Sequence, residues 1–198
     1  MRQLTERQQK IYDFVSEQHG TQVRKYSGEP YVNHCLEVAE LVYKYVPSDF
    51  LWTIAMCHDL LEDTNCTLEV LTDFLESVGF NSGQSNYMAF DVNALTDKFT
   101  VENYPEWNRS KRKEEEAIKL GNTEMNVHTI KYADIISNTR SIVAYDSKFA
   151  LTYLPEKVQL LHYMRKGDIN LYIQACAEVY NGLRSVGLLE NLNLVYED

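Results

Sequence analysis

Glycine and proline are scarce in this sequence, with eight and four residues among 198. So little of either excludes a linker-rich or disordered chain. Hydrophobic residues make up 44% and charged residues 24%, which is typical of a globular protein. The length suits one domain with its own core. We therefore expect a single domain over residues 1–198.

Basic residues are also few, because 19 Lys and Arg stand against 29 Asp and Glu and give a net charge of −10. A protein that coats a nucleic acid needs a basic face to neutralise phosphates. We therefore expect no nucleic-acid partner. A small phosphorylated substrate remains compatible, since a bound divalent cation supplies positive charge that the sum over side chains omits.

Long apolar runs and paired cysteine motifs are absent. The most apolar stretch, residues 50–57, is too short to cross a bilayer, and the N-terminal MRQLTERQQK contains no signal-peptide run. None of the four cysteines forms a C-x-x-C pair, which argues against a zinc knuckle, and the composition argues against a disulfide framework. We expect a cytoplasmic protein with free cysteines and no membrane partner.

Apolar residues recur with helical period through most of the chain, and no alternating strand pattern persists. Thr5 and Gln8 can form a capping box at the first helix, and Gly79 and Gly187 are suited to end helices. Residues 79–90 carry no charge and two glycines, and we expect a long loop there. The pattern predicts an all-α, single-domain helical bundle with helices near 5–18, 33–46, 50–63, 67–79, 105–120, 123–145, 154–166 and 168–186, of which Pro105 and Pro155 open two.

The segment AMCHDLLEDT places four ionisable residues within six positions at the end of an apolar helix. On an unbroken helix His58 and Glu62 lie nearly over one another, with Asp59 and Asp63 beside them. Unpaired charges are costly to bury. The segment is therefore either a helix end fraying into solvent or part of a functional site.

Two further segments are compatible with the same site. His34 stands where a helix begins in GEPYVNHCLEVAELV. In VHTIKYADIISNTRSI a polar stripe within roughly 80° of one helix face is either solvated or lines a site. The stripe consists of Lys131, Asp134, Asn138 and Ser141.

Together these segments resemble the HD superfamily of metal-dependent phosphohydrolases, and above all its RelA/SpoT-type (p)ppGpp hydrolase branch. That branch shows R-K…G-x-P-Y-x-x-H, H-D-x-x-E-D-T and K-x-A-D-x-x-x-N in this order. Here they begin at Arg24, His58 and Lys131, and Ala94-Leu95-Thr96-Asp97-Lys98 is similar to a family segment between the last two. The resemblance covers about residues 15–145 and implies an HD-type fold, with C-terminal helices at about 154–186 outside the motif-bearing core.

The resemblance also implies roles for the motif residues. It implies one divalent metal ion, usually Mn²⁺ in this branch, and two carboxylates that orient and deprotonate the attacking water. Mixed imidazole and carboxylate ligands suit a first-row divalent ion without distinguishing Mn²⁺ from Zn²⁺, Fe²⁺ or Co²⁺. The implied metal ligands are His34, His58, Asp59 and Asp134, and the implied catalytic residues are Glu62 and Asp63.

The substrate implied by the resemblance is a small phosphorylated nucleotide. The expected reaction removes pyrophosphate from the 3′ position of guanosine 3′,5′-bis(diphosphate), leaving GDP or GTP. Arg24 and Lys25 would contact its base or phosphates, and Asn138 and Ser141 its sugar and base. Two alternatives remain open at this point: a phosphohydrolase for another nucleotide such as NADPH, and a metal-binding regulatory protein with little catalysis.

Overall fold

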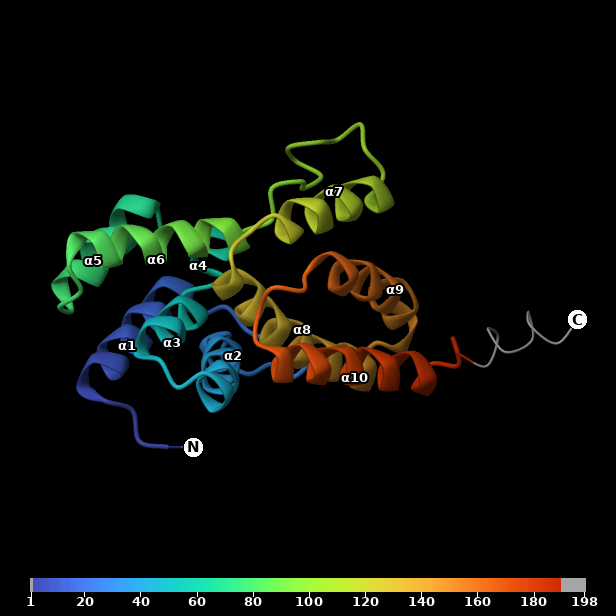
Figure 1. Ribbon diagram of the computed structural model, residues 1–198, viewed down its shortest axis with the longest axis horizontal. Coiled ribbons are helices and arrows are strands. Elements are labelled where there is room, and N and C mark those ends of the chain that lie inside the picture. The colour runs from blue at the N-terminus through green and yellow to red at the C-terminus, as the bar shows by residue number, and fades with distance from the viewer. Residues whose placement is uncertain (1, 190–198) are drawn as a thin grey trace, which may run out of the picture.

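The computed structural model describes residues 2–189, which form helices joined by short connections (Figure 1). Within this range β-type pairing is limited to one isolated antiparallel bridge between Val23 and Pro30. The prediction of an all-α fold is therefore confirmed. The helices are α1 (Glu6–His19), α2 (Val32–Tyr45), α3 (Asp49–Met56), α4 (Leu60–Asp63), α5 (Leu68–Ser77), α6 (Ser82–Leu95), α7 (Arg109–Gly121), α8 (Met125–Tyr145), α9 (Ser147–Tyr163) and α10 (Ile169–Ser185).

Helix α8 is the central element of the fold. It packs against α2 and α6 from the N-terminal half of the chain, and against α9 and α10 from the C-terminal half (Figure 1). Buried residues such as Ile130, Ala133 and Ile136 cover most of its circumference, as expected of a helix enclosed by neighbours. Polar residues on such a buried helix need polar partners, so the contacts of its Asp134 indicate where a functional site lies. No helix in the described part of the chain is both long and apolar enough to span a bilayer.

The helix ends follow several of the sequence signals. Thr5 Oγ1 accepts a hydrogen bond from the Gln8 amide at 3.2 Å, and the Gln8 side chain accepts one from the Thr5 amide at 3.1 Å. The expected capping box is thus present. Gly79 and Gly187 follow α5 and α10 with φ of 95° and 76°, a left-handed conformation that glycine adopts without strain.

The prediction of a loop at residues 79–90 is wrong, because this segment contains most of α6. Asn81 caps the helix by accepting from the Gln84 amide at 3.0 Å, and Gln84 returns a bond to the Asn81 amide at 3.1 Å. Met88, Val92 and Leu95 are buried one turn apart along one face. The absence of charge therefore does not indicate a loop here.

The single helix expected at residues 50–63 is also wrong. Helix α3 ends at Met56, and Cys57 and Asp59 adopt φ,ψ of −94°, 2° and −99°, 0° before the short α4 begins. His58 and Asp59 lie in this turn. The stacked columns expected of an unbroken helix therefore do not apply.

The prediction that Pro105 and Pro155 open two helices is wrong. Helix α7 begins at Arg109, where Asn108 accepts from the Lys111 amide at 2.9 Å. Helix α9 begins at Ser147, where Asp146 accepts from the Phe149 amide at 3.0 Å, and Pro155 lies inside the helix. In both cases a polar cap satisfies free amides and sets the helix start.

Candidate metal centre and its cavity

Four side chains from three parts of the chain converge beside α8. His34 comes from the first turn of α2, His58 and Asp59 from the turn after α3, and Asp134 from the middle of α8. His34 Nε2 lies 3.3 Å from Asp134 Oδ1 and 3.6 Å from Asp59 Oδ2. His58 Nε2 lies 3.0 Å from Asp59 Oδ2 and 3.8 Å from Asp134 Oδ1. All four predicted metal ligands are therefore neighbours.

Both imidazole rings are oriented by a hydrogen bond at Nδ1. His58 Nδ1 lies 2.8 Å from the Ala55 carbonyl oxygen, which can only accept, so Nδ1 donates. Ser137 Oγ donates to Glu37 Oε2 at 2.7 Å and is therefore free to accept from His34 Nδ1 at 3.0 Å. These contacts favour the tautomers in which Nε2 of each ring presents a lone pair to the carboxylates.

The donor set fits a divalent metal ion. Nε2 of His34 and Nε2 of His58 are buried without a hydrogen-bond partner among the described residues. Donor atoms of His34, His58 and Asp59 lie within 4.8 Å of one another. Two imidazole nitrogens with carboxylate oxygens form a mixed set that suits first-row divalent ions. A bound cation would satisfy the two ring nitrogens.

The electrostatics lead to the same conclusion. Burial opposes charging of His58, but Asp59 and Asp134 outweigh burial and raise the pKa of His58 to about 10. Burial also opposes ionisation of Asp134, yet Lys131, His34 and His58 hold its pKa well below the usual range. The cluster thus requires positive charge near its carboxylates. A divalent ion would supply that charge and displace the imidazole proton.

Glu62 and Asp63 stand beside this cluster and keep access to solvent. Glu62 Oε2 accepts a hydrogen bond from the Asp97 amide at 2.9 Å. Partial desolvation, followed by the charge of Asp97, raises the pKa of Glu62 to about 7. Partial desolvation and the charge of Asp59 also raise the pKa of Asp63. A carboxylate that titrates near neutral pH can take a proton from water.

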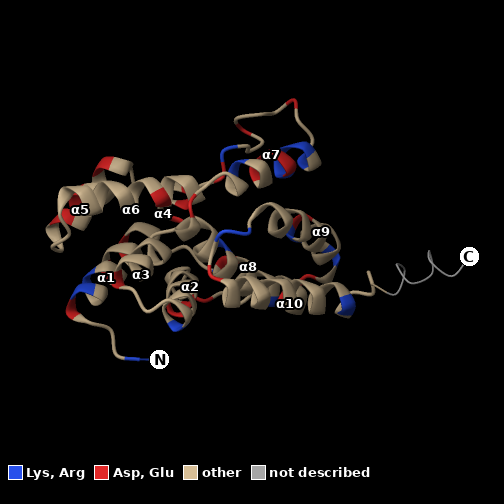
Figure 2. Cartoon of the chain, viewed as in Figure 1, with Lys and Arg blue, Asp and Glu red and all other residues tan. Residues whose placement is uncertain are grey.

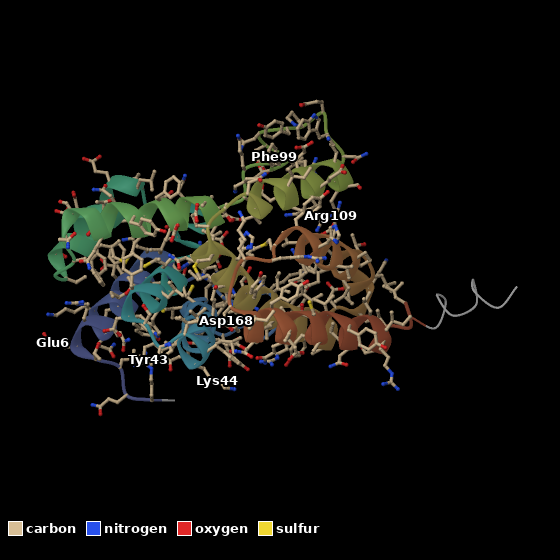
Figure 3. All side chains as sticks on the ribbon, viewed as in Figure 1. Glu6, Tyr43, Lys44, Phe99, Arg109 and Asp168 are labelled. Carbon is tan, nitrogen blue, oxygen red and sulfur yellow. The ribbon has the colours of Figure 1, made fainter. Side chains whose placement is uncertain are left out.

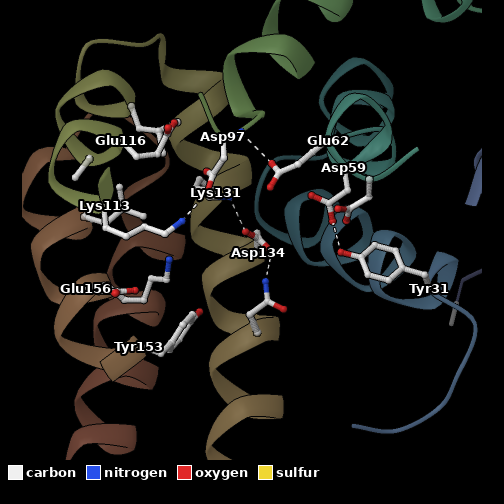
Figure 4. A pocket seen from close by; sticks show the side chains of 16 residues that line it. Tyr31, Asp59, Glu62, Asp97, Lys113, Glu116, Lys131, Asp134, Tyr153 and Glu156 are labelled. Atoms are coloured by element: carbon white, nitrogen blue, oxygen red, sulfur yellow. Dashed lines mark hydrogen bonds and ion pairs between the residues drawn. The ribbon is translucent and has the colours of Figure 1, made fainter. Parts of the chain in front are cut away.

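The two aspartates of the cluster, Asp59 and Asp134, line one cavity of about 180 Å³ together with Glu62 and Asp63. In Figure 4, Asp59, Glu62 and Tyr31 lie on one side, Lys131 and Asp134 on α8 lie in the middle, and α7 and α9 form the opposite wall. Tyr31 donates from its hydroxyl to Asp59 Oδ2 at 2.8 Å. Lys131 Nζ lies 3.0 Å from Asp134 Oδ2.

The four predicted substrate-binding residues differ in their position relative to the cluster and its cavity. Asn138 Nδ2 donates to Asp134 Oδ1 at 2.5 Å and so contacts the cluster, and Arg24 is connected to it through Asn138, whose Oδ1 accepts from Arg24 Nη1 at 3.0 Å. Lys25 is exposed, and its Nζ lies 3.5 Å from Asp146 Oδ2. Ser141 is half-buried one turn beyond Asn138 and does not line the cavity. Neither Lys25 nor Ser141 is brought to the metal cluster.

Several residues of the site were not found by sequence reasoning. Ser137 and Glu37 orient His34, but a lone serine inside an apolar helix and a glutamate on an exposed face give no signal. Tyr153 and Lys157 line the cavity from α9. Tyr153 lies just before the helix expected at residues 154–166, and Lys157 lies within that helix but outside the three motifs.

No family model matches the chain. It is 39% identical over 71 residues to the guanosine-3′,5′-bis(diphosphate) 3′-pyrophosphohydrolase of Aquifex aeolicus, a match that covers 36% of this chain and 10% of that protein. It is 35% identical over 72 residues to a probable GTP pyrophosphokinase of Mycobacterium leprae, covering 36% of this chain and 9% of the relative. The chain thus spans only about a tenth of the curated relatives that it matches.

A solved structure, described as a metazoan ortholog of SpoT that hydrolyzes ppGpp, has a similar fold. Its TM-score is 0.73, with 18% identity over 95% of this chain and 99% of that one. The structural likeness confirms the HD-type helical fold. With the local sequence matches, it confirms the resemblance to the RelA/SpoT branch.

Proposed function

We propose that this protein is a metal-dependent hydrolase that removes pyrophosphate from the 3′ position of (p)ppGpp and leaves GDP or GTP. The main support for the proposal is one cavity in which two solvent-accessible carboxylates, Glu62 and Asp63, adjoin a buried cluster of two histidines and two aspartates. The name of the Aquifex relative and the description of the SpoT ortholog support the choice of substrate.

In this proposal His34, His58, Asp59 and Asp134 hold one divalent ion, with Mn²⁺ as the first choice. When bound, such an ion lowers the pKa of water and polarises phosphoryl oxygens. Tyr31 keeps Asp59 in place through its hydroxyl, and Asn138 does the same for Asp134.

Glu62 is the proposed general base. Its pKa of about 7 leaves a large fraction of carboxylate at neutral pH and still allows it to accept a proton. Asp63, on the same short helix, would orient the attacking water. Lys131 lies beside Asp134 and would neutralise charge that develops on the phosphoryl oxygens while the bond to the ribose 3′ oxygen breaks.

The remaining predicted contacts belong to the nucleoside part of the substrate. We assign Arg24 and Asn138 to the ribose, because Asn138 lines the cavity beside Asp134 and accepts a hydrogen bond from Arg24. Lys25 and Ser141 lie outside the cavity, so they would contact only groups that extend beyond it, such as the base. These assignments are proposals that a bound nucleotide would test.

The experiment is a substrate panel on the purified full chain with Mn²⁺. It compares ppGpp, pppGpp, NADPH and a nucleoside 3′-monophosphate at equal concentration, with products separated by ion-exchange chromatography. We expect GDP and GTP from the first two, each with one pyrophosphate. Release of inorganic phosphate from NADPH alone would replace the alarmone substrate, and absence of turnover with Mn²⁺, Zn²⁺, Fe²⁺ and Co²⁺ would refute a hydrolase.

A double variant separates catalysis from metal binding. Replacing Glu62 and Asp63 by alanine should abolish turnover and leave metal content unchanged, because neither residue belongs to the metal cluster. If the wild type binds metal and turns over no substrate, the regulatory alternative is favoured instead.

A further inference from the structure

Lys157 is a cation without an acidic partner on the wall of the cavity. It lies on α9, is half-buried and lines the space shared with the metal cluster. In the described part of the chain its ammonium makes neither a hydrogen bond nor an ion pair, and its contact is the ring of Tyr153, 4.8 Å from Nζ to the centroid. Tyr153 and Lys157 are four residues apart and therefore share one face of the helix.

The neighbouring lysines are all paired. Lys113 Nζ lies 2.6 Å from Asp97 Oδ2, and Lys131 Nζ lies 3.0 Å from Asp134 Oδ2. Lys119 Nζ lies 2.7 Å from Glu116 Oε1. Figure 4 shows Lys113 reaching toward Asp97 and Lys131 across the cavity. Figure 2 shows that α7, which carries Lys113, bears both signs of charge.

The carboxylates on the same wall are already paired as well. Glu116 Oε2 accepts from the Lys98 and Phe99 amides at 2.8 and 3.1 Å. Glu156, directly before Lys157, receives two hydrogen bonds from Arg109 at 2.6 and 3.0 Å. Figure 3 places Arg109 at the end of α7 that faces α9. No carboxylate on this wall is left to neutralise Lys157.

Repulsion from the neighbouring lysines outweighs the attraction of Lys157 to Asp134 and Asp97, which are themselves paired with Lys131 and Lys113. Desolvation, followed by repulsion from Lys131 and Lys113, lowers the pKa of Lys157 to about 8. A desolvated cation without a partner costs folding free energy, and an anion bound beside it would offset that cost. The buried hydroxyl of Tyr153 adds a donor on the same wall: it has no hydrogen-bond partner of ordinary geometry, and Thr139 is the polar side chain beside it.

We propose that Lys157 and Tyr153, in the field of Lys113 and Lys131, form an anion subsite for the second phosphate of a diphosphate whose first phosphate lies at the metal cluster. The inference rests on the proposed function and deepens it, because it selects diphosphates over monophosphates. The main support is that one cavity is lined by Asp59, Asp134 and Lys157. A single ligand in that cavity would therefore adjoin both the cluster and the free ammonium of Lys157.

The test measures anion binding and not turnover. Pyrophosphate and inorganic phosphate are titrated calorimetrically into the full chain, with and without added Mn²⁺, for wild type, Lys157→Met and Lys157→Arg. Lys148→Met is the matched control, because Lys148 is an exposed lysine on the same helix outside the cavity. Metal content and melting temperature are recorded for each protein.

For Lys157→Met we expect pyrophosphate affinity to fall about 10- to 100-fold, the range of one lost charge-assisted hydrogen bond. Phosphate affinity should change less than threefold, because one phosphate occupies the metal cluster without reaching Lys157. Lys157→Arg and Lys148→Met should bind pyrophosphate within threefold of wild type. The melting temperature of Lys157→Met should not fall, since the variant removes an unpaired desolvated charge.

Unchanged pyrophosphate affinity in Lys157→Met, or an equal loss for both anions, would overturn the subsite. If Lys157→Met does not fold, Lys157→Gln is titrated in its place under the same criteria. The outcome is independent of catalysis. Lys157-dependent pyrophosphate binding without ppGpp hydrolysis refutes the proposed function alone, and hydrolysis with Lys157-independent binding refutes the subsite alone.

Discussion

Removal of the Ser137 hydroxyl should weaken metal binding while the fold remains intact. Ser137 Oγ stands between His34 Nδ1 at 3.0 Å and Glu37 Oε2 at 2.7 Å. In Ser137→Ala the Nδ1–H of His34 loses its acceptor, and the ring loses the bond that aims Nε2 at the carboxylates. Residues that orient a metal-bound histidine in this way contribute roughly 10- to 100-fold to metal affinity.

The variant should also lower the free energy of unfolding of the metal-free protein. An imidazole N–H left buried without an acceptor costs about 1–3 kcal/mol. The assay is Mn²⁺ titration in competition with a chelator of known affinity, together with urea unfolding of the metal-free protein.

Two control variants separate the effect of the Ser137 hydroxyl from that of any buried hydroxyl on α8. Ser137→Thr retains the hydroxyl and should bind metal within about threefold of wild type. Thr139→Val removes a buried hydroxyl on the same helix that makes no hydrogen bond of ordinary geometry, and metal affinity should not change. The reasoning is refuted if Ser137→Ala binds Mn²⁺ as tightly as wild type, or if Thr139→Val weakens binding equally.

Three further predictions address catalysis and folding. Glu62→Gln should reduce kcat by about 10²- to 10⁴-fold at unchanged metal content, the usual contribution of a general base, and a loss below threefold would assign that role elsewhere. Activity should rise with pH through about 7 as Glu62 ionises. Asp97→Asn should move this rise in activity to lower pH, because the charge of Asp97 raises the pKa of Glu62. An unchanged pH dependence in Asp97→Asn would show that Asp97 does not raise this pKa. Asn81→Ala should lower the free energy of unfolding by about 0.5–2 kcal/mol in urea, and no change would mean that Asn81 does not stabilise α6.

The fold class and the residues that come together beside α8 could be predicted from the sequence because their signals are local. Helical periodicity predicts most of the helices, and three short motifs contain His34, His58, Asp59 and Asp134. The motifs name residue types in order along the chain. Tertiary packing brings their side chains within 4 Å of one another, as the four His–Asp distances show.

Other features depend on packing that the sequence does not encode locally. Helix α6 has no charged face to set against its buried Met88 and Val92, so its amphipathic pattern is faint. The turn at His58 interrupts an apolar run without glycine or proline. Ser137 contacts Glu37, a hundred residues earlier in the chain, and Lys157 lines a cavity with residues of other helices, so only the assembled structure shows their surroundings.

The central claim is that one divalent ion held by His34, His58, Asp59 and Asp134 is required for cleavage of a 3′-diphosphate. The most direct measurement follows ppGpp by ³¹P NMR with metal-stripped protein, before and after stoichiometric Mn²⁺, with metal content determined on the same sample. We expect one ion per chain, no reaction before its addition, and equal amounts of GDP and pyrophosphate afterwards. Equal turnover by the stripped protein, or intact ppGpp beside a fully loaded metal centre, would contradict it.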